Sequence, residues 1–153
     1  MITRQSLLRG APLGAALPAA ASAAAKGPNP EANRASALAF TDMVFNQKRV
    51  REAFAAYVGP TYVQHNPQVP DGRDGAIAGL GGLLGQNPQF RCVVRRSVAE
   101  GDLVVLHVEA YPNPQHRGLA IIDIFRFENG KIVEHWDVIQ PVPETARNTN
   151  TMF

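Results

Sequence analysis

Residues 121–138 read Ile-Ile-Asp-Ile-Phe-Arg-Phe-Glu-Asn-Gly-Lys-Ile-Val-Glu-His-Trp-Asp-Val. Apolar and polar side chains alternate on both sides of a short polar break that contains an Asn-Gly pair. Alternation with a period of two is typical of a strand with one buried face, and Asn-Gly between two such strands predicts a β-hairpin. The two halves of this stretch are therefore expected to pair as neighbouring antiparallel strands.

Two carboxylates lie in apolar surroundings within this hairpin. Asp123 is flanked by isoleucines, and Asp137 stands between Trp136 and Val138. The charged form of a carboxylate is poorly solvated there, so each group is either paired or functional. With His135, which lies two residues before Asp137, they are the predicted catalytic residues. The alternative is that Asp123 and His135 form a satisfied buried pair that only sets the strand register.

The length of the turn decides which of these side chains share a face. A two-residue Asn-Gly turn would pair Asp123 with Trp136 and put it on the opposite face from Asp137. A three-residue loop beginning at Glu128 would pair Asp123 with His135 and put all three candidates on one face. We predict the three-residue loop, because glutamate closes a tight primed turn poorly and glycine suits a left-handed third position.

The rest of the chain predicts helices first and strands afterwards. Apolar residues recur at helical spacing before residue 60, where Gly59 and Pro60 are expected to end the second helix, and strand-type alternation begins at residue 90. This order indicates an α+β fold with an antiparallel meander. The predicted helices are residues 31–47, 50–58 and 76–84, the strands are residues 90–98, 103–111, 119–127 and 131–140, and residues 62–67 form a short extended piece.

Composition and charge favour one globular domain. The chain has 153 residues, 45% of them hydrophobic, which suits a single core. Without Arg4 and Arg9, which lie in the N-terminal segment, 13 of the 15 basic residues remain and balance the 13 acidic residues. A neutral domain does not support nucleic-acid binding. Cys92 is the only cysteine, which excludes an internal disulfide, and we expect it to be a buried small hydrophobe.

Residues 1–25 are predicted to be a signal peptide, so that the protein is exported to the periplasm or secreted. They carry two arginines, a weakly apolar run and a series of small residues, and they resemble a degenerate twin-arginine signal with Gln5 in place of one arginine. The alternative is an alanine-rich leader that is not cleaved. Two prolines and a glycine interrupt the run, which excludes a stable membrane span. The domain would cover residues 28–140 and the C-terminal tail residues 141–153.

Five further residues are predicted to bind substrate. His65 and Asn66 follow the helices, and Asn66 before a proline has the alternative role of capping a turn. His107 lies on a strand, where a single histidine is more often a satisfied core residue. Tyr62 and Phe125 complete the set. The four histidines show no short ligand spacing and there is no Gly-rich phosphate loop, so we expect neither a metal nor a cofactor.

These residues resemble the SnoaL-like polyketide cyclase family of the nuclear transport factor 2-like superfamily. The resemblance rests on Tyr-Val-Gln-His-Asn-Pro at residues 62–67 and on the hairpin, and it covers residues 31–140. It implies a cone-shaped α+β barrel with N-terminal helices packed on a curved, mainly antiparallel sheet. It also implies that Asp137 is the acid/base of a metal-free and cofactor-free aldol ring closure. A family histidine on the preceding strand is replaced here by Asp123, whereas His135 matches a family histidine.

The expected reaction is removal of a proton next to a carbonyl of a small apolar substrate by Asp137. A donor such as Asp123, His135 or His65 would stabilise the enolate, which leads to cyclisation or isomerisation. Two alternatives stay open: a hydrophobic small-molecule binding protein, and an epoxide-type hydrolase in which Asp123 and Asp137 activate water.

The resemblance further implies a homodimer that uses the outer face of the sheet. On that face we expect Trp136, and Arg126 paired diagonally with Glu134. The alternative is that Trp136 packs under the C-terminal tail.

Overall fold

The computed structural model describes residues 29–153, so the predicted signal peptide lies outside the described residues. The described chain forms three helices and five strands. In order they are α1 (Pro30–Phe45), α2 (Val50–Tyr57), β1 (Val58–Gln64), α3 (Gly72–Gln86), β2 (Arg91–Glu100), β3 (Leu103–Tyr111), β4 (Leu119–Glu128) and β5 (Lys131–Pro141).

Local signals account for the first helix. Asn29 caps α1 by accepting a hydrogen bond at its side-chain oxygen from the amide of Ala32 at 3.1 Å, and Pro30 occupies the first turn, where a missing N–H costs nothing. Ala37, Phe40 and Val44 form the buried stripe of α1. This stripe packs on the sheet and on α2, and it anchors one wall of the core.

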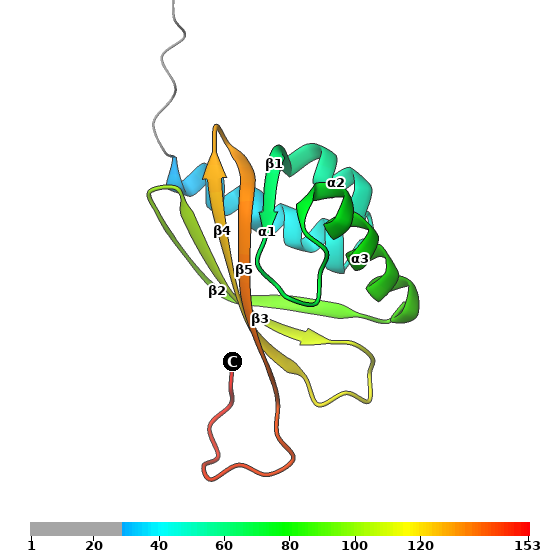
Figure 1. The fold of residues 1–153 in the computed structure, drawn as a ribbon. Helices are drawn as coiled ribbons and strands as arrows, with labels where there is room; N and C mark the ends of the chain where they lie inside the picture. The colour runs from blue at the N-terminus through cyan, green and yellow to red at the C-terminus, as the bar shows by residue number, and fades with distance from the viewer. Residues whose placement is uncertain (1–28) are drawn as a thin grey trace, which may run out of the picture.

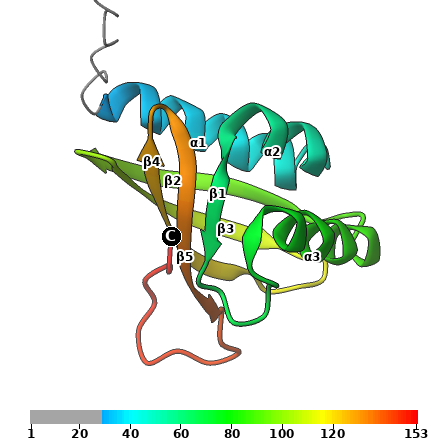
Figure 2. The same ribbon diagram turned by 45° about the horizontal axis from the view of Figure 1, so that its top comes forward.

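The sheet is open and mixed, with strand order β1-β5-β4-β3-β2. Strands β2 to β5 form the predicted antiparallel meander, and β1 adds to β5 in parallel. The helices lie on one face of the curved sheet, as Figure 1 and Figure 2 show. The predicted α+β class and the packing of N-terminal helices on a mainly antiparallel sheet are confirmed.

Strand β1 begins earlier than the sequence predicted. Helix α2 ends at Tyr57, and Gly59 and Pro60 are the second and third residues of β1 rather than a break after the helix. Proline is tolerated here because β1 is an edge strand, and its pairing with β5 is irregular between Val58 and Val63. The strand carries its C-terminal end to the middle of β5.

The predicted three-residue loop of the hairpin is wrong. Asn129 and Gly130 both have positive φ, 51° and 75°, and form a two-residue turn that pairs Glu128 with Lys131. A β-bulge follows, because Arg126 pairs with Glu134 while Phe127 pairs with Ile132. The bulge inserts one extra residue in β5 and so reverses which face the later residues occupy.

The consequence is a register that neither turn length alone predicts. Asp123 lies directly opposite Asp137, and Phe125 lies opposite His135. The three candidates therefore share the inner face, as expected, although they reach it by a different pairing. On the outer face Arg126 Nε donates to Glu134 Oε2 at 2.6 Å, directly across the strands rather than diagonally.

The C-terminal tail folds back beside the sheet. The amide of Val142 donates to the carbonyl of Gly118 at 3.0 Å, and Arg117 donates to the carbonyls of Pro143 and Glu144. The tail brings the Phe153 ring to 6.2 Å from that of His107. Trp136 contacts His65 instead: their rings stack at 4.7 Å.

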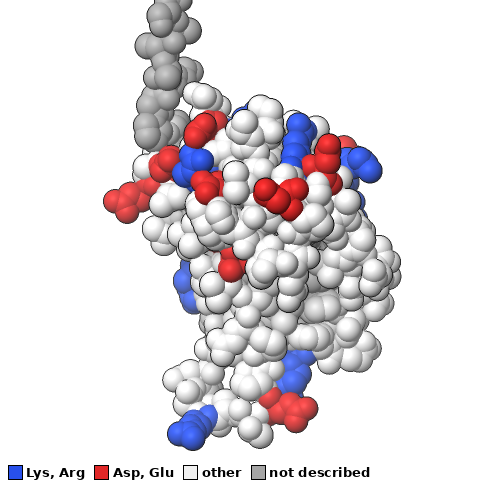
Figure 3. Space-filling view, in the orientation of Figure 1, with Lys and Arg blue, Asp and Glu red and all other residues white. Residues whose placement is uncertain are grey.

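Positive and negative side chains are intermixed on the face shown in Figure 3, and its middle is mostly uncharged. Among the helices of residues 29–153, none combines the length and the apolar character needed to cross a membrane.

Candidate functional site

A cavity of about 350 Å³ lies between the helices and the inner face of the sheet. Apolar side chains form most of its wall, among them phenylalanines of α1, leucines of α3 and aliphatic side chains of β3 and β4. Its volume is in the range of sites for small organic molecules. The polar residues of the lining are Gln64, Asn66, Gln68, Asp123, His135 and Asp137.

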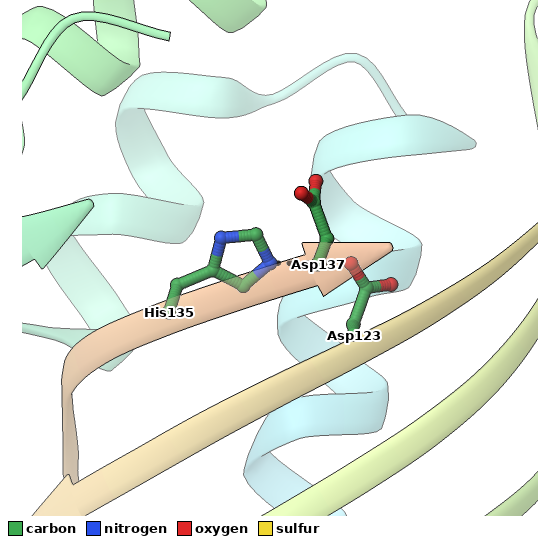
Figure 4. A group of neighbouring side chains, drawn as sticks. All are labelled: Asp123, His135 and Asp137. Atoms are coloured by element: carbon green, nitrogen blue, oxygen red, sulfur yellow. Dashed lines mark hydrogen bonds and ion pairs between the residues drawn. The ribbon is translucent and has the colours of Figure 1, made fainter. Parts of the chain in front are cut away.

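The β4–β5 pair supplies the central polar group. Figure 4 shows Asp123 on β4 and His135 and Asp137 on β5, with all three side chains projecting from the same side of the sheet. One ligand-type atom from each lies within 4.8 Å of the others. Asp123 is buried, while the other two are partly buried. The predicted catalytic residues are thus brought together in the cavity.

Asp137 is held by Asn66. The amide Nδ2 of Asn66 donates to both carboxylate oxygens of Asp137, at 2.9 and 2.7 Å. At its other end, Oδ1 of Asn66 accepts from the backbone amide of Gln68 at 2.8 Å. The two readings of Asn66 are therefore compatible, because it caps a turn and also reaches the site. Its contact orients the Asp137 carboxylate in the cavity.

His135 is held at both ring nitrogens. Nδ1 lies 3.0 Å from Gln64 Oε1, and Nε2 lies 3.1 Å from Asp123 Oδ1. The Phe125 ring packs 5.0 Å from the imidazole ring, on the same face. This fixes the imidazole between β1 and β4, so Asp123 and His135 do form the buried pair considered as an alternative. The pair nevertheless lines the cavity.

Gln64 is a site residue that the sequence reasoning missed. Its Oε1 also accepts from the backbone amide of Asn66 at 2.9 Å, and its Nε2 donates to the hydroxyl of Tyr62 at 3.0 Å. Burial raises the pKa of the Tyr62 hydroxyl well above its usual range, so the phenol stays protonated. The i, i+2 spacing of Tyr62 and Gln64 on a strand was the signal that both face the cavity.

The end of β1 is fixed by an acidic side chain. Asp71 Oδ1 accepts from the backbone amide of Gln64 at 2.9 Å. This hydrogen bond, with one from the Gly72 amide, holds the pKa of Asp71 below its usual range. The contact ties the start of α3 to the strand that carries Gln64.

His65 and His107 do not line the cavity. His65 Nε2 lies 2.9 Å from Glu134 Oε1 and its ring stacks on Trp136. The His107 ring contacts Arg96 and Phe153. Both predicted substrate contacts therefore lie on the outer side of the sheet. The cause is the alternation of side chains in extended backbone. His65, the residue after β1, lies on the side opposite to Gln64, and in β3 the neighbours of His107, Leu106 and Val108, are the buried residues.

The donor set of Asp123, His135 and Asp137 has a composition that divalent transition metals accept. Both ring nitrogens of His135 already face hydrogen-bond partners. A metal at this point would therefore replace the contact between Asp123 and His135.

Residues 37–135 match the family model of the SnoaL-like domain. The chain belongs to the SnoaL-like family. In this SnoaL-like chain the matched region ends at His135 within β5, so the family model spans β1 to β4 and most of the cavity lining but stops before Asp137. A comparison with curated protein sequences finds no match.

Solved structures agree with the SnoaL-like fold. A candidate SnoaL-like polyketide cyclase from Jannaschia sp. CCS1 has a TM-score of 0.63 and 20% identity, over 74% of this chain and 89% of that one. A candidate ketosteroid isomerase from Kribbella flavida has a TM-score of 0.63 and 18% identity, over 79% and 87%. TsrD from Streptomyces laurentii has a TM-score of 0.58 and 23% identity, over 69% and 89%. At these identities the likeness establishes the fold.

Proposed function

We propose that this SnoaL-like protein is an enzyme that removes a proton next to the carbonyl of a small, uncharged, apolar compound, with Asp137 as general base and no cofactor. One observation carries the proposal. A carboxylate held at both oxygens by Asn66 faces a mostly apolar cavity beside a second, linked acid/base pair. Such a carboxylate has the position that proton abstraction requires.

The reaction follows from the positions of three side chains. Asp137 takes the proton from the carbon next to the carbonyl, and the electron pair moves onto the carbonyl oxygen. The Asp123–His135 pair, whose atoms lie within 4.8 Å of those of Asp137, donates a hydrogen bond or a proton to that oxygen. The enolate then attacks a second carbonyl, whose oxygen takes the proton from Asp137 as the ring closes, or it is reprotonated by Asp137 at another carbon, which gives an isomer.

The lining argues for an uncharged substrate. Within residues 29–153 the cavity wall includes two aspartates and no lysine or arginine. A substrate carboxylate or phosphate would lose its hydration without gaining a cation, which is costly in an apolar site. The names of two structural neighbours, a candidate polyketide cyclase and a candidate ketosteroid isomerase, are in keeping with a ketone substrate.

Deuterium exchange tests the proposal without knowledge of the final product. Polycyclic ketones, steroids and aromatic polyketide fragments are incubated with the protein in D₂O, and their mass is followed with time. We expect the native protein to introduce deuterium next to a carbonyl. Asp137→Asn should bind the same ketone without exchanging it, whereas Asp74→Asn, which changes an exposed aspartate outside the cavity lining, should exchange at the native rate.

The competing functions give different results in the same experiment. Binding of a ketone with equal affinity by native protein and Asp137→Asn, with exchange by neither, would show a binding protein. The short separation of Asp123 and Asp137 also suits two carboxylates that hold a water, which favours epoxide hydrolysis as the second candidate. Epoxides in H₂¹⁸O would then yield a labelled diol only with both carboxylates present.

We also propose that the protein is an exported homodimer. The outer face of the sheet carries exposed apolar side chains, among them Ile122, Val98 and Val138, the last two exposed at 65% and 70%. These are unusual for a solvated sheet face and support a contact there. Sedimentation of native protein and Val138→Glu tests the dimer, and N-terminal sequencing of protein from the periplasm or medium tests the cleavage of residues 1–25.

A further inference from the structure

The orientation of the Gln64 amide is determined by a backbone group. The Asn66 amide can only donate, and it points at one atom of the Gln64 side chain at 2.9 Å. That atom must therefore be the oxygen, which leaves the nitrogen to donate to Tyr62. The same oxygen faces Nδ1 of His135 at 3.0 Å.

This oxygen decides where His135 carries its proton. Two lone pairs facing each other at 3.0 Å repel, so Nδ1 must hold a hydrogen that it donates to Gln64. Nε2 of a neutral His135 then has only a lone pair, and it faces Asp123 Oδ1 at 3.1 Å. A hydrogen must lie between these two atoms as well, on either the imidazole or the carboxyl group.

Asn66 has the opposite effect on Asp137. The Gln68 amide donates to Asn66 Oδ1, so the Asn66 NH₂ group is the part that faces Asp137. An NH₂ group only donates, and it is satisfied by an ionised carboxylate. Within the segment 64–66, one amide therefore presents an acceptor and the other presents a donor.

We propose that Gln64 is a positioning residue that keeps Nδ1 of His135 protonated and so leaves one shared proton between His135 and Asp123, ready for the substrate oxygen. The role of this proton in turnover rests on the proposed function, whereas its location does not. Asp137, which faces the donor of Asn66, is left as the base.

Over one catalytic cycle, each proton that a side chain gains or gives is returned. Asp137 gains the proton from the substrate carbon, and the substrate oxygen gains the proton shared by Asp123 and His135. Nδ1 keeps its hydrogen throughout, because Gln64 continues to accept it. When the product is released as a ketone, the first oxygen returns its proton to the pair. Asp137 gives its proton to another carbon in isomerisation, or to the oxygen of the second carbonyl in ring closure. No other reactant is needed.

Nitrogen-15 NMR of the histidine side chains locates the protons directly. In the native protein at neutral pH we expect His135 Nδ1 to be protonated. In Gln64→Leu, which removes the acceptor, the tautomer with hydrogen on Nε2 alone should appear. Gln64→Glu keeps an acceptor and should keep Nδ1 protonated. The control Gln140→Leu makes the same change at an exposed residue of β5 outside the cavity lining, and it should leave the His135 signals unchanged.

Turnover gives the second readout. We expect Gln64→Leu to lower kcat about tenfold or more with a smaller change in KM, because proton donation is impaired while the cavity remains. An unprotonated Nδ1 in the native protein, or His135 signals that Gln64→Leu leaves unchanged, would overturn the proposal. If these signals behave as expected but Asp137→Asn exchanges deuterium normally, the proposed function fails and the assignment of Gln64 stands.

Discussion

Replacing Asn66 by aspartate is a sharp test of how Asp137 is held. The new side chain keeps the shape of asparagine and the oxygen that accepts from the Gln68 amide, so the turn is preserved. It loses only the NH₂ group that donates to Asp137 and puts a second carboxylate in its place. The variant therefore changes the electrostatics of the site with little change in its structure.

The magnitude follows from the separation of the two groups. Asn66 Nδ2 lies 2.7 and 2.9 Å from the oxygens of Asp137, and both residues are partly buried. Two carboxylates at that separation repel by about 6 kcal/mol at an effective dielectric constant of about 20. Protonating one ordinary aspartate at pH 7 costs about 4 kcal/mol. Because protonation costs less free energy than the repulsion between two charged carboxylates, the two carboxylates of the variant share a proton at pH 7.

A base that already holds a proton cannot take another. A positioned general base typically contributes about 100-fold to 10,000-fold to a rate, and we expect deuterium exchange by Asn66→Asp at pH 7 to fall by that order. Because the shared proton leaves as the pH rises, the acid limb of the rate profile should move to higher pH. Asn113→Asp is the matched control, since Asn113 accepts from the amide of Gln115 in the same kind of turn outside the cavity lining. Native exchange rates in both variants at pH 7 would refute the reasoning.

The remaining predictions concern stability and reactivity. Phe54→Ala removes a fully buried ring and should lower the free energy of unfolding by about 3–5 kcal/mol in urea titrations; a loss below 1 kcal/mol would contradict this packing. In α3, Gly81→Ala should stabilise by about 0.5–1 kcal/mol, because its new Cβ meets open space. Gly75→Ala should destabilise, because its Cβ would lie 2.9 Å from the Pro70 carbonyl oxygen; equal effects at the two glycines would refute the difference. Burial raises the pKa of the Cys92 thiol to about 12 from 9.0, so iodoacetamide at pH 8.5 should alkylate Cys92 slowly unless urea is present. Between pH 9 and 12 the buried thiol of the native state keeps its proton while the thiol of the unfolded chain loses it. The free energy of unfolding should therefore decline as the pH rises from 9 to 12, and Cys92→Ala should lack this part of the decline.

Short-range patterns were enough to predict most elements. Alternation located the four antiparallel strands within a few residues, and the helical spacing of Ala37, Phe40 and Val44 located α1. Strand β1 was only partly predicted, because a Gly-Pro pair is a typical break. The irregular edge position that makes Pro60 acceptable depends on β5, which is remote in the sequence.

In the site, too, local sequence patterns failed to predict contacts between segments that are remote in the sequence. The hairpin predicted that Asp123, His135 and Asp137 share a face, although the reason was a β-bulge after a two-residue turn, and turn propensity carries no signal of a bulge. The contacts of Asn66 with Asp137 and of Gln64 with His135 come from the parallel pairing of β1 with β5. No local pattern contains that pairing. The i, i+2 spacing of Tyr62 and Gln64 shows that the two side chains share a face, but not that Gln64 reaches His135 or that His65 lies on the other side.

The parallel pairing of β1 with β5 also has a consequence for the order of folding. The contacts that Gln64, at the end of β1, and Asn66, just after it, make with His135 and Asp137 each join residues 71 positions apart. Such contacts form late, because the entropy of closing a long loop is lost before the contact repays it, whereas the hairpins of β2 to β5 close locally. In pulsed hydrogen exchange we expect amides of β4 to gain protection before that of His65, which donates to the carbonyl of His135; simultaneous protection would contradict this order. During refolding, the sheet would then be present before the protein is active, and the docking of one edge strand would set the time at which activity appears.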